Sequence, residues 1–295
     1  MANSKYAYVR QFEEATNPLL LPGCFVVVRV DGQGFGRLSR AYGMRKPNDQ
    51  RCCDLLVRAA QAVMQRFSPD VALSYGQSDE FSFLFRKGSS CFRRRANKLT
   101  SLVPSVFAAA FVRLWPHFFP QQPLRHEPAF DARAVLFPDA AVVRDYLRWR
   151  QVDCHVNNLY NSVFHALAGD FVRHRLSDQQ VLAEPLAAYS DPHFSPLTPQ
   201  QATQRLSGTR AADKNEILFS QFAVNYNDEL QQFRKGSLIL LTRDQVANNR
   251  DQKQRREQLH DDYWTSPVQT EVLHIDIIND SFWQEYQYIA DYMET

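Results

Sequence analysis

Hydrophobic positions in the first third of the chain change their period several times, and each change predicts an element. The run CFVVVRV at 24–30 is β-branched and predicts a buried strand. Apolar residues then recur at helical spacing and predict a helix over 49–67. The segments 71–77 and 80–85 follow with a short link between them, and the second alternates as a strand does. These two segments therefore predict a β-hairpin.

A second helix and strand complete this pattern. Residues 91–115 predict a long helix that is basic at its start and apolar later, and AVLF at 134–137 predicts a short strand. The resulting order β-α-β-β-α-β is typical of the ferredoxin-like, split βαβ arrangement. We therefore expect an α+β fold with one antiparallel sheet, in which the first and third strands are neighbours.

The rest of the chain predicts a mainly helical C-terminal region appended to this core. We expect a division into 1–138, which carries the chemistry, and 139–295. The pattern in the second part predicts helices at 140–150, 153–168 and 212–222, a proline-rich, loop-like insertion near 170–199, and strands at 237–242 and 271–277.

Charge is nearly balanced over the whole chain but not along it. Hydrophobic residues make up 44% and charged residues 22% of the 295 positions, as in ordinary globular proteins, and the net charge is only +2. The 46 residues from Phe81 to His126, however, hold eight Lys or Arg and no acid. Such a window favours either a local anionic partner or a solvated basic helix face.

Cysteine usage and hydropathy bear on the compartment. Five cysteines form no C-x-x-C pair, which favours reduced thiols and an intracellular protein. The N-terminal stretch lacks the apolar core of a signal peptide, and the apolar run 102–112 is too short to span a membrane. We expect an intracellular protein without a membrane partner, in the cytoplasm first, with the nucleus and mitochondrion left open.

Two aspartates fall at the same edge of the expected sheet. Asp31 ends the first strand and Asp79 begins the third, and these strands are antiparallel neighbours. Carboxylates at that separation repel each other, and a divalent cation relieves the repulsion. Mg²⁺ prefers carboxylates combined with substrate phosphates, and two such ions assist phosphoryl displacement. The pair therefore predicts a magnesium–nucleotide site.

Residues around this pair have the chemistry of a phosphate cradle. The glycines within Gly32-Gln33-Gly34-Phe35-Gly36 let backbone N–H groups approach a triphosphate. Lys46 offers a point charge for the phosphates, and Ser78 offers a hydroxyl. Asp-Gly and Ser-Asp-Glu sequences are also common in ordinary turns. Their joint placement at one sheet edge favours the site over two unrelated turns.

Competing motifs find no match in the chain. The glycine pattern is G-x-G-x-G rather than G-x-G-x-x-G, and no long helix is expected to open from it, which disfavours a dinucleotide fold. No H-E-x-x-H, paired Cys/His spacing or G-x-S-x-G occurs. Glu80 follows Asp79 directly, and strand alternation turns it to the other face.

Ordered sequence blocks from about residue 4 to 283 closely resemble the tRNA-histidine guanylyltransferase family. Two blocks are especially specific, namely HVNNLYN at 155–161 and ADKNE at 212–216. The other matching blocks are SKYAYVRQFE, VVRVDGQGF, KPND, YGQSDEFSF, FRRRANK and HIDIINDSFW.

This resemblance implies an enzyme that adds guanosine to the 5′ end of histidine tRNA. It implies activation of the tRNA 5′-monophosphate by ATP, attack by the 3′-hydroxyl of GTP with loss of AMP, and removal of pyrophosphate. It also implies a polymerase-like palm, two Mg²⁺ ions, the substrates ATP and GTP, and a homo-oligomer that is usually a tetramer.

The resemblance also implies roles for individual residues. Asp31, Asp79 and the Gly32 carbonyl would be the metal ligands, and Asp31, Asp79, Lys46 and Ser78 the catalytic set. The nucleotide would contact Asp31, Gly32, Gln33, Gly34, Phe35, Gly36, Lys46, Asn48, Ser78 and Asp79. Contacts with tRNA or phosphate would come from Arg93, Arg94, Arg95, Lys98, His155, Asn157, Asn158, Asn161 and Lys214.

The chain departs from the family pattern in its glycine loop and in its insertion. Gln33 stands where a basic residue is common and Gly36 where His is common, so side-chain contacts of this loop are in doubt. The connection 170–199 is longer than is typical. Three other functions stay open: template-directed 3′–5′ repair of tRNA 5′ ends, nucleotide cyclisation, and tRNA binding without catalysis.

Overall fold

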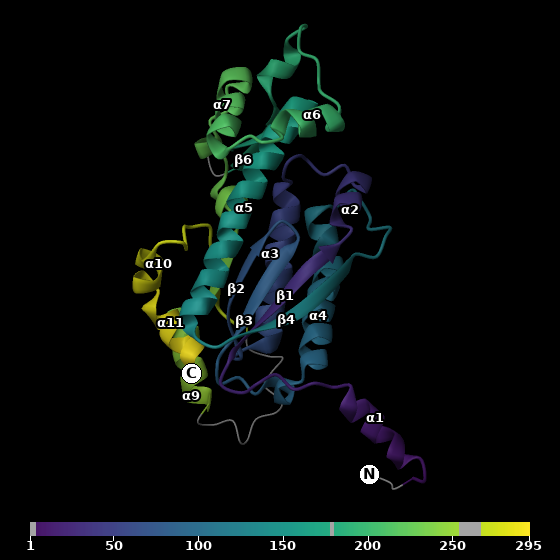
Figure 1. The fold of residues 1–295 in the computed structure, drawn as a ribbon, viewed down its shortest axis with the longest axis vertical. Coiled ribbons are helices and arrows are strands. Elements are labelled where there is room, and N and C mark those ends of the chain that lie inside the picture. The colour runs from purple at the N-terminus through teal and green to yellow at the C-terminus, as the bar shows by residue number, and fades with distance from the viewer. Residues whose placement is uncertain (1–3, 178–179, 254–266) are drawn as a thin grey trace.

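The protein is described by a computed structural model that covers residues 4–177, 180–253 and 267–295. One antiparallel sheet has the strand order β4-β1-β3-β2-β7-β8 (Figure 1). Its first four strands follow the order expected for a βαββαβ chain, so the α+β prediction is confirmed. The strands are β1 (Phe25–Gln33), β2 (Val71–Gln77), β3 (Glu80–Phe85), β4 (Ala129–Phe137), β7 (Ser237–Leu241) and β8 (Thr270–Leu273).

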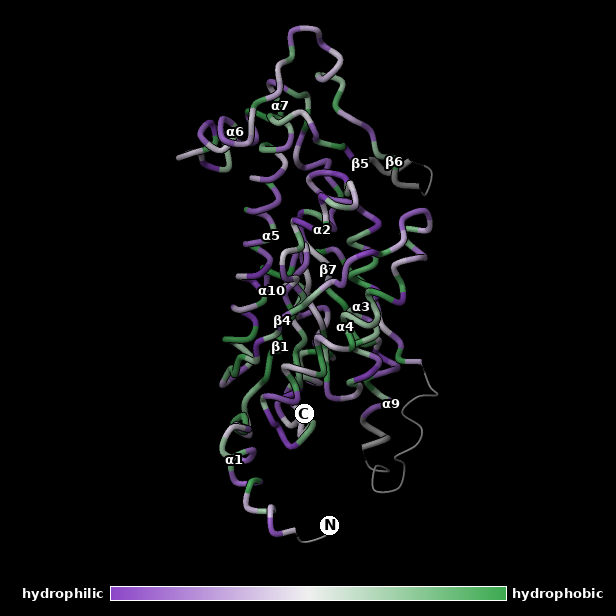
Figure 2. The backbone as a smooth tube through the Cα atoms, turned by 90° about the vertical axis from the view of Figure 1, so that its right-hand side faces the viewer, coloured by the Kyte–Doolittle hydropathy of each residue, from purple (hydrophilic) through white to green (hydrophobic). Residues whose placement is uncertain are grey.

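Helices cover both faces of the sheet, and β3 is buried on both sides. Phe81 and Phe83 contact Phe107 of α4 (Ala96–Phe118), which packs beside α3 (Gln50–Phe67) on one face. Ser82 lies between them, points the other way and bonds the hydroxyl of Tyr146 on α5 (Ala140–Ala168), 2.7 Å away. Figure 2 shows hydrophobic stretches gathered in the sheet and in α3 and α4.

Helix α4 is long and apolar enough to cross a membrane by length and composition alone. It nevertheless packs against α3, β1 and β4. Phe107, Phe111 and Trp115 are among its side chains that are buried in the core. The length and hydropathy of α4 are therefore those of a helix that forms the wall of the core.

The long helix α5 connects two hydrophobic cores. Val143 and Leu147 in its first half belong to the core of the sheet. Leu159 and Val163 in its second half belong to a separate, smaller core. That second core is completed by α6 (Pro199–Leu206), α7 (Ala211–Phe222) and the turn of 3₁₀ helix η4 (Tyr226–Asp228).

The prediction of two helices at 140–150 and 153–168 is wrong, because α5 is continuous between its Asp139 cap and Gly169. Gln151 lies at the expected break, but its side chain is buried. Its amide donates to the carbonyls of Lys235 and Ile275, both at 2.9 Å. A polar residue inside the helix therefore anchors α5 to later parts of the chain rather than ending it.

The prediction of a loop-like insertion near 170–199 is also wrong. Strands β5 (Val172–Ser177) and β6 (Gln180–Pro185) form a hairpin, and η3 (Ala187–Ser190) follows. The prolines of this stretch begin only at the end of β6, so they do not prevent the pairing. The Val172 N–H donates to the Lys46 carbonyl at 2.6 Å, which ties the hairpin to the first part of the chain.

The helix expected at 91–115 begins later, at Ala96. Residues Cys91–Arg94 form the separate turn η2, in which Phe92, Arg93 and Arg94 all have positive φ angles. At this kink the Arg94 side chain turns inward and donates to the carbonyls of Cys24 and Ser89, both at 2.9 Å.

The remaining elements lie at the ends of the molecule and beside β2 in the sheet. Helix α1 (Arg10–Ala15) projects from the end of the sheet opposite to α2 (Phe35–Ala41) (Figure 1). Strands β7 and β8 pair beside β2, so the sheet includes residues beyond 138. The other elements are η1 (Ala7–Val9), α8 (Gln231–Lys235), α9 (Arg243–Lys253), α10 (Asp280–Glu285) and α11 (Gln287–Glu294).

Candidate active site

The structure brings Asp31 and Asp79 together at the end of the sheet nearest to α2. Asp31 lies near the end of β1, Asp79 directly precedes β3, and the Gly32 N–H donates to the Asp79 carbonyl at 3.2 Å. A Cβ atom on Gly32 would lie 2.9 Å from both the Cβ and the Oδ2 of Asp79. The glycine after Asp31 therefore allows the second carboxylate to approach.

Asp79 is held in an environment that disfavours its charge. Burial raises the pKa of Asp79, and the carboxylates of Asp31 and Glu80 raise it further. A hydrogen bond of 3.0 Å from the Ser78 hydroxyl opposes this shift. Ser78 has a φ of 50° at the tip of the hairpin, and this left-handed conformation places its hydroxyl beside Asp79. The carboxylates at this site therefore repel one another, and a bound cation would relieve that repulsion.

Glu80 is directly opposite Asp31 in the pairing of β1 with β3. Its carboxylate is already engaged, since Arg150 lies at 3.1 Å and Arg29 at 3.4 Å. Sequence reasoning missed both arginines. The signal for Arg29 was present, because a charge within the β-branched run of β1 requires a buried partner.

The donor set fits magnesium but not an all-protein metal cage. In the described parts of the chain, no group of three or more His, Cys, Asp or Glu side chains is placed to hold a metal ion. Asp31, Asp79 and the Gly32 carbonyl supply oxygen donors only. Mg²⁺ commonly takes one or two carboxylates and completes its shell with substrate phosphates and water. These residues therefore fit an ion that binds together with a nucleotide.

The glycine loop forms a sharp turn, and its side chains are placed in different ways. Gly34 has a φ of +67° and precedes α2, which opens directly from the loop but is only seven residues long. Phe35 packs against Phe111 and Phe130, so it serves the core rather than a base. Arg37, which sequence reasoning missed, folds back so that its Nη2 is 2.9 Å from a Cβ position on Gly34.

The K-P-N-D segment lies beside this loop. Lys46 Nζ donates to the Ser39 hydroxyl at 2.6 Å, and burial lowers the pKa of Lys46. Asn48 donates to the side-chain carbonyl of Asn158 at 2.8 Å, and Asn158 in turn donates to the Tyr226 hydroxyl at 3.1 Å. Asn48 is predicted to contact the nucleotide and Asn158 to contact RNA. In this structure the two side chains bond each other in a partly buried position.

The HVNNLYN helix presents some of its polar residues and buries another. His155, Asn157 and Asn161 are exposed. Asn158 is buried, and its side chain bonds both Asn48 and Tyr226. Burial lowers the pKa of His155, and Lys235 and Arg234 lower it further. Lys214 lies in the first turn of α7, where its ammonium donates to the Thr209 carbonyl at 2.8 Å.

The basic block at 93–98 lies at the opposite end of the sheet from the carboxylates. Arg94 bonds the carbonyl of Cys24, just before β1, and Asp31 is seven residues further along, about 23 Å in an extended strand. The basic block is therefore not continuous with the carboxylate site. Arg94 is also buried, so its side chain does not meet a phosphate, whereas Arg93 and Lys98 are exposed and Arg95 is half-buried.

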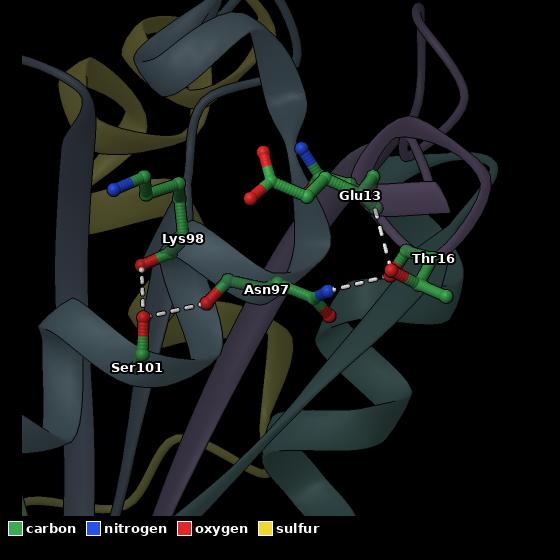
Figure 3. Close-up of a pocket in the computed structure, with 6 residues that line it drawn as sticks. Glu13, Thr16, Asn97, Lys98 and Ser101 are labelled. Carbon is green, nitrogen blue, oxygen red and sulfur yellow. Dashed lines mark hydrogen bonds between the residues drawn. The ribbon is translucent and has the colours of Figure 1, made fainter. Parts of the chain in front are cut away.

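Lys98 lines a polar pocket of about 350 Å³ between α1 and the start of α4 (Figure 3). Asn97 holds this pocket together by donating its amide to the Thr16 carbonyl at 2.8 Å. The Glu13 carboxylate lies on the side facing Lys98 (Figure 3). Lys98 is thus exposed beside an acid, which reduces the net positive charge of this end.

Two family models match almost the entire chain. The model described as tRNAHis guanylyltransferase matches residues 6–138, and the model described as Thg1 C terminal domain matches 141–188 and 193–279. A Mus musculus protein named "Probable tRNA(His) guanylyltransferase" is 43% identical over 97% of this chain and 88% of its own length. The Schizosaccharomyces pombe tRNA(His) guanylyltransferase is 41% identical over 96% of both chains.

Solved structures agree with these matches. The crystal structure of the Saccharomyces cerevisiae tRNA(His) guanylyltransferase has a TM-score of 0.68 and 39% identity, covering 80% of this chain and 93% of its own. A bacterial tRNA(His) guanylyltransferase-like protein in complex with ATP has a TM-score of 0.67. The two chains are 21% identical, and the match, which covers 97% of this chain and 99% of the other, shows a common fold.

Proposed function

The chain belongs to the tRNA(His) guanylyltransferase family of nucleotidyltransferases, and we propose that it extends the 5′ end of histidine tRNA by one guanosine, at position −1. The observation that carries this proposal is the approach of Asp31 to Asp79 across β1 and β3, beside a glycine turn. The glycine turn supplies backbone that can approach a triphosphate beside these two carboxylates.

The reaction has two displacements and one hydrolysis. An oxygen of the tRNA 5′-monophosphate attacks the α-phosphorus of ATP, and pyrophosphate leaves. The 3′-hydroxyl of GTP then loses its proton and attacks the tRNA 5′-phosphorus of that adenylylated end, and AMP leaves. Water finally cleaves pyrophosphate from the added GTP, which leaves a 5′-monophosphate.

Asp31 and Asp79 would have the same role in both displacements. Their carboxylates would hold the Mg²⁺ ions beside the triphosphate. With Mg²⁺ bound, two ions would neutralise phosphate charge and orient the attacking and leaving oxygens. The raised pKa of Asp79 supports this assignment, because the ionised carboxylate gains from a cation. The Ser78 hydroxyl orients the Asp79 carboxylate through their hydrogen bond of 3.0 Å.

Backbone and side chains around the pair would bind the nucleotide. Backbone N–H groups of the turn from Gln33 to Gly36 would contact the triphosphate, and Lys46 supplies a cation held by Ser39. Gln33 and Gly36 add no charge, so the backbone and Lys46 carry the triphosphate contact. Arg37 is a further cation at the turn.

The proposal extends to contacts with the tRNA and to the assembly. Exposed His155, Asn157 and Asn161 on α5 are offered for RNA, with Arg93 and Lys98 meeting a more distant part of the tRNA. We also propose the tetramer, an intracellular location, and a functional division near residue 138. The polymerase-type palm is proposed for the sheet and its helices.

The test maps the 5′ end of a monophosphorylated tRNA-His transcript after incubation with ATP, labelled GTP and Mg²⁺. One added guanosine is expected, and Asp31→Asn and Asp79→Asn are each expected to abolish it. Asp145→Asn is the matched control, because this exposed carboxylate on α5 bonds only Arg148 within the described chain. Full incorporation by Asp79→Asn would refute the assignment of the site.

Substrate range separates the proposal from 5′-end repair. The same assay with other tRNAs truncated at their 5′ ends is expected to give much less product than tRNA-His. Equal or greater extension of truncated tRNAs would identify a template-directed repair polymerase instead.

A further inference from the structure

A cavity of about 510 Å³ opens on the outer side of α3 and α4, away from the carboxylate pair. Its lining comes from α3, from the last turns of α4, and from Val268 and Thr270 at the start of β8. None of the lining residues belongs to the glycine loop, the β2–β3 hairpin or the K-P-N-D segment. The cavity is therefore separate from the site of guanosine addition.

Cations in this cavity lack acidic partners. Arg58, Arg113 and His117 line it, and no Asp or Glu does. Within residues 4–177, 180–253 and 267–295, none of the three forms an ion pair, and Arg58 donates only to the Gln61 carbonyl at 3.2 Å. Two guanidinium groups with this freedom suit a phosphate, which both can bind in bidentate fashion.

Amide side chains fix the wall of the cavity instead of competing for its ligand. Gln61 donates to the Thr270 hydroxyl at 2.9 Å, and Gln65 accepts from the Val268 N–H at 2.5 Å. These bonds join α3 to the start of β8 across the cavity. The wall is therefore formed before any ligand arrives, which lowers the entropic cost of binding.

Apolar side chains give the cavity a second character. Leu114 and Phe118 on α4 stand beside the arginines, and both are only partly buried. An aromatic ring next to phosphate-binding cations suits a base attached to a phosphate, and the volume is within the range of small-ligand sites. An RNA strand would need cations that continue along α4, but the exposed residues of α4 between Lys98 and Arg113 carry no charge.

We propose that this cavity binds a free nucleotide, with its phosphates on Arg58, Arg113 and His117 and its base against Phe118. Binding there would let the enzyme respond to the nucleotide pool without occupying the carboxylate site. This proposal does not depend on the function assigned to Asp31 and Asp79.

The test measures ATP binding to the full-length protein by equilibrium dialysis without tRNA. Two classes of site are expected in the wild type, and one is expected in the double variant Arg58→Gln/Arg113→Gln, whose second-class affinity falls at least about tenfold. Arg205→Gln on α6 is the matched control and is expected to keep both classes. Photolabelling with 8-azido-ATP is expected to mark the peptide that contains Phe118, and the double variant is expected to lose this label.

His117→Gln provides a second variant if the double variant unfolds, which its circular dichroism would show. ATP binding that a folded double variant leaves unchanged, whether the wild type shows one class of site or two, would overturn the proposal. Weaker tRNA binding with unchanged ATP binding would also overturn it and assign the cavity to RNA. GTP incorporation is expected to persist in the double variant, so failure here is distinguishable from failure of the proposed function.

Discussion

Asn48 donates its side-chain amide to the side-chain carbonyl of Asn158, 2.8 Å away, and so joins the loop that carries Lys46 to the middle of α5. Asn158 is buried and passes the connection on to the Tyr226 hydroxyl. The chain thereby links two sequence blocks 110 residues apart through one amide pair. This bond holds the segment proposed for triphosphate contact against the helix that carries the exposed residues proposed for RNA contact.

Replacing Asn158 with Leu leaves the Asn48 amide and the Tyr226 hydroxyl without this partner. We expect the free energy of unfolding to fall by about 1–3 kcal/mol, measured by urea denaturation. Asn157→Ala, one residue away but exposed, is the control and should change stability by less than about 0.5 kcal/mol. Equal effects of the two substitutions would show that the amide pair contributes nothing special.

Asp79→Asn should separate activity from stability. The pKa of Asp79 is raised in the folded protein, so its ionised form at neutral pH opposes folding, and a neutral amide removes that cost. We expect a higher thermal midpoint without Mg²⁺, together with at least about a thousandfold loss of guanosine addition. A lower midpoint would indicate that the carboxylate stabilises the hairpin through Ser78 instead.

Gly32→Ala tests the approach of the two carboxylates. The new methyl group would lie 2.9 Å from Asp79 and from the Phe35 ring, so Asp79 must shift. We expect turnover to drop about a hundredfold, because displacement of a reacting group by about 1 Å is costly. Gly36→Ala meets nothing nearer than Arg40 at 4.0 Å and should retain most of the activity.

Arg93 and Arg94 should behave in opposite ways although they are adjacent. Arg94→Gln breaks bonds to buried carbonyls and should cost about 3 kcal/mol of stability. Arg93→Gln should leave stability unchanged and lower the slope of log K for tRNA against log salt by about one. A filter-binding titration over salt and a denaturation curve for each variant distinguish these outcomes.

Glu229 should make stability depend on pH near neutrality. Burial raises the pKa of Glu229 to about 7, against the opposing effects of Arg173 and Arg234. Because the folded pKa exceeds the unfolded value, this contribution is full below the unfolded pKa and is lost as pH rises through about 7. The unfolding free energy should therefore fall between pH 5 and pH 8 by an amount approaching about 3 kcal/mol.

Glu229→Gln isolates that contribution. Burial lowers the pKa values of His155, His165 and His174, and these residues change stability in the opposite sense as the pH falls. The difference between wild type and Glu229→Gln cancels the histidines. A difference that does not vary with pH would show that Glu229 titrates normally.

The sequence by itself determined the α+β class, the order of the first four strands and the placement of Asp31 and Asp79 at one edge of the sheet. All three follow from local periods and from the geometry of the βαββαβ chain, in which the end of the first strand and the start of the third share an edge. The family was also readable, because its blocks are contiguous along the chain.

Only the tertiary structure decided which polar residues are available. Arg93 and Arg94 are the same residue type in adjacent positions, and so are Asn157 and Asn158. Arg94 and Asn158 are nevertheless buried, because their side chains bond groups from distant segments. Continuity of α5 at Gln151 likewise depends on contacts with Lys235 and Ile275. Local sequence cannot report such partners, because burial is set by chain segments that meet only after folding.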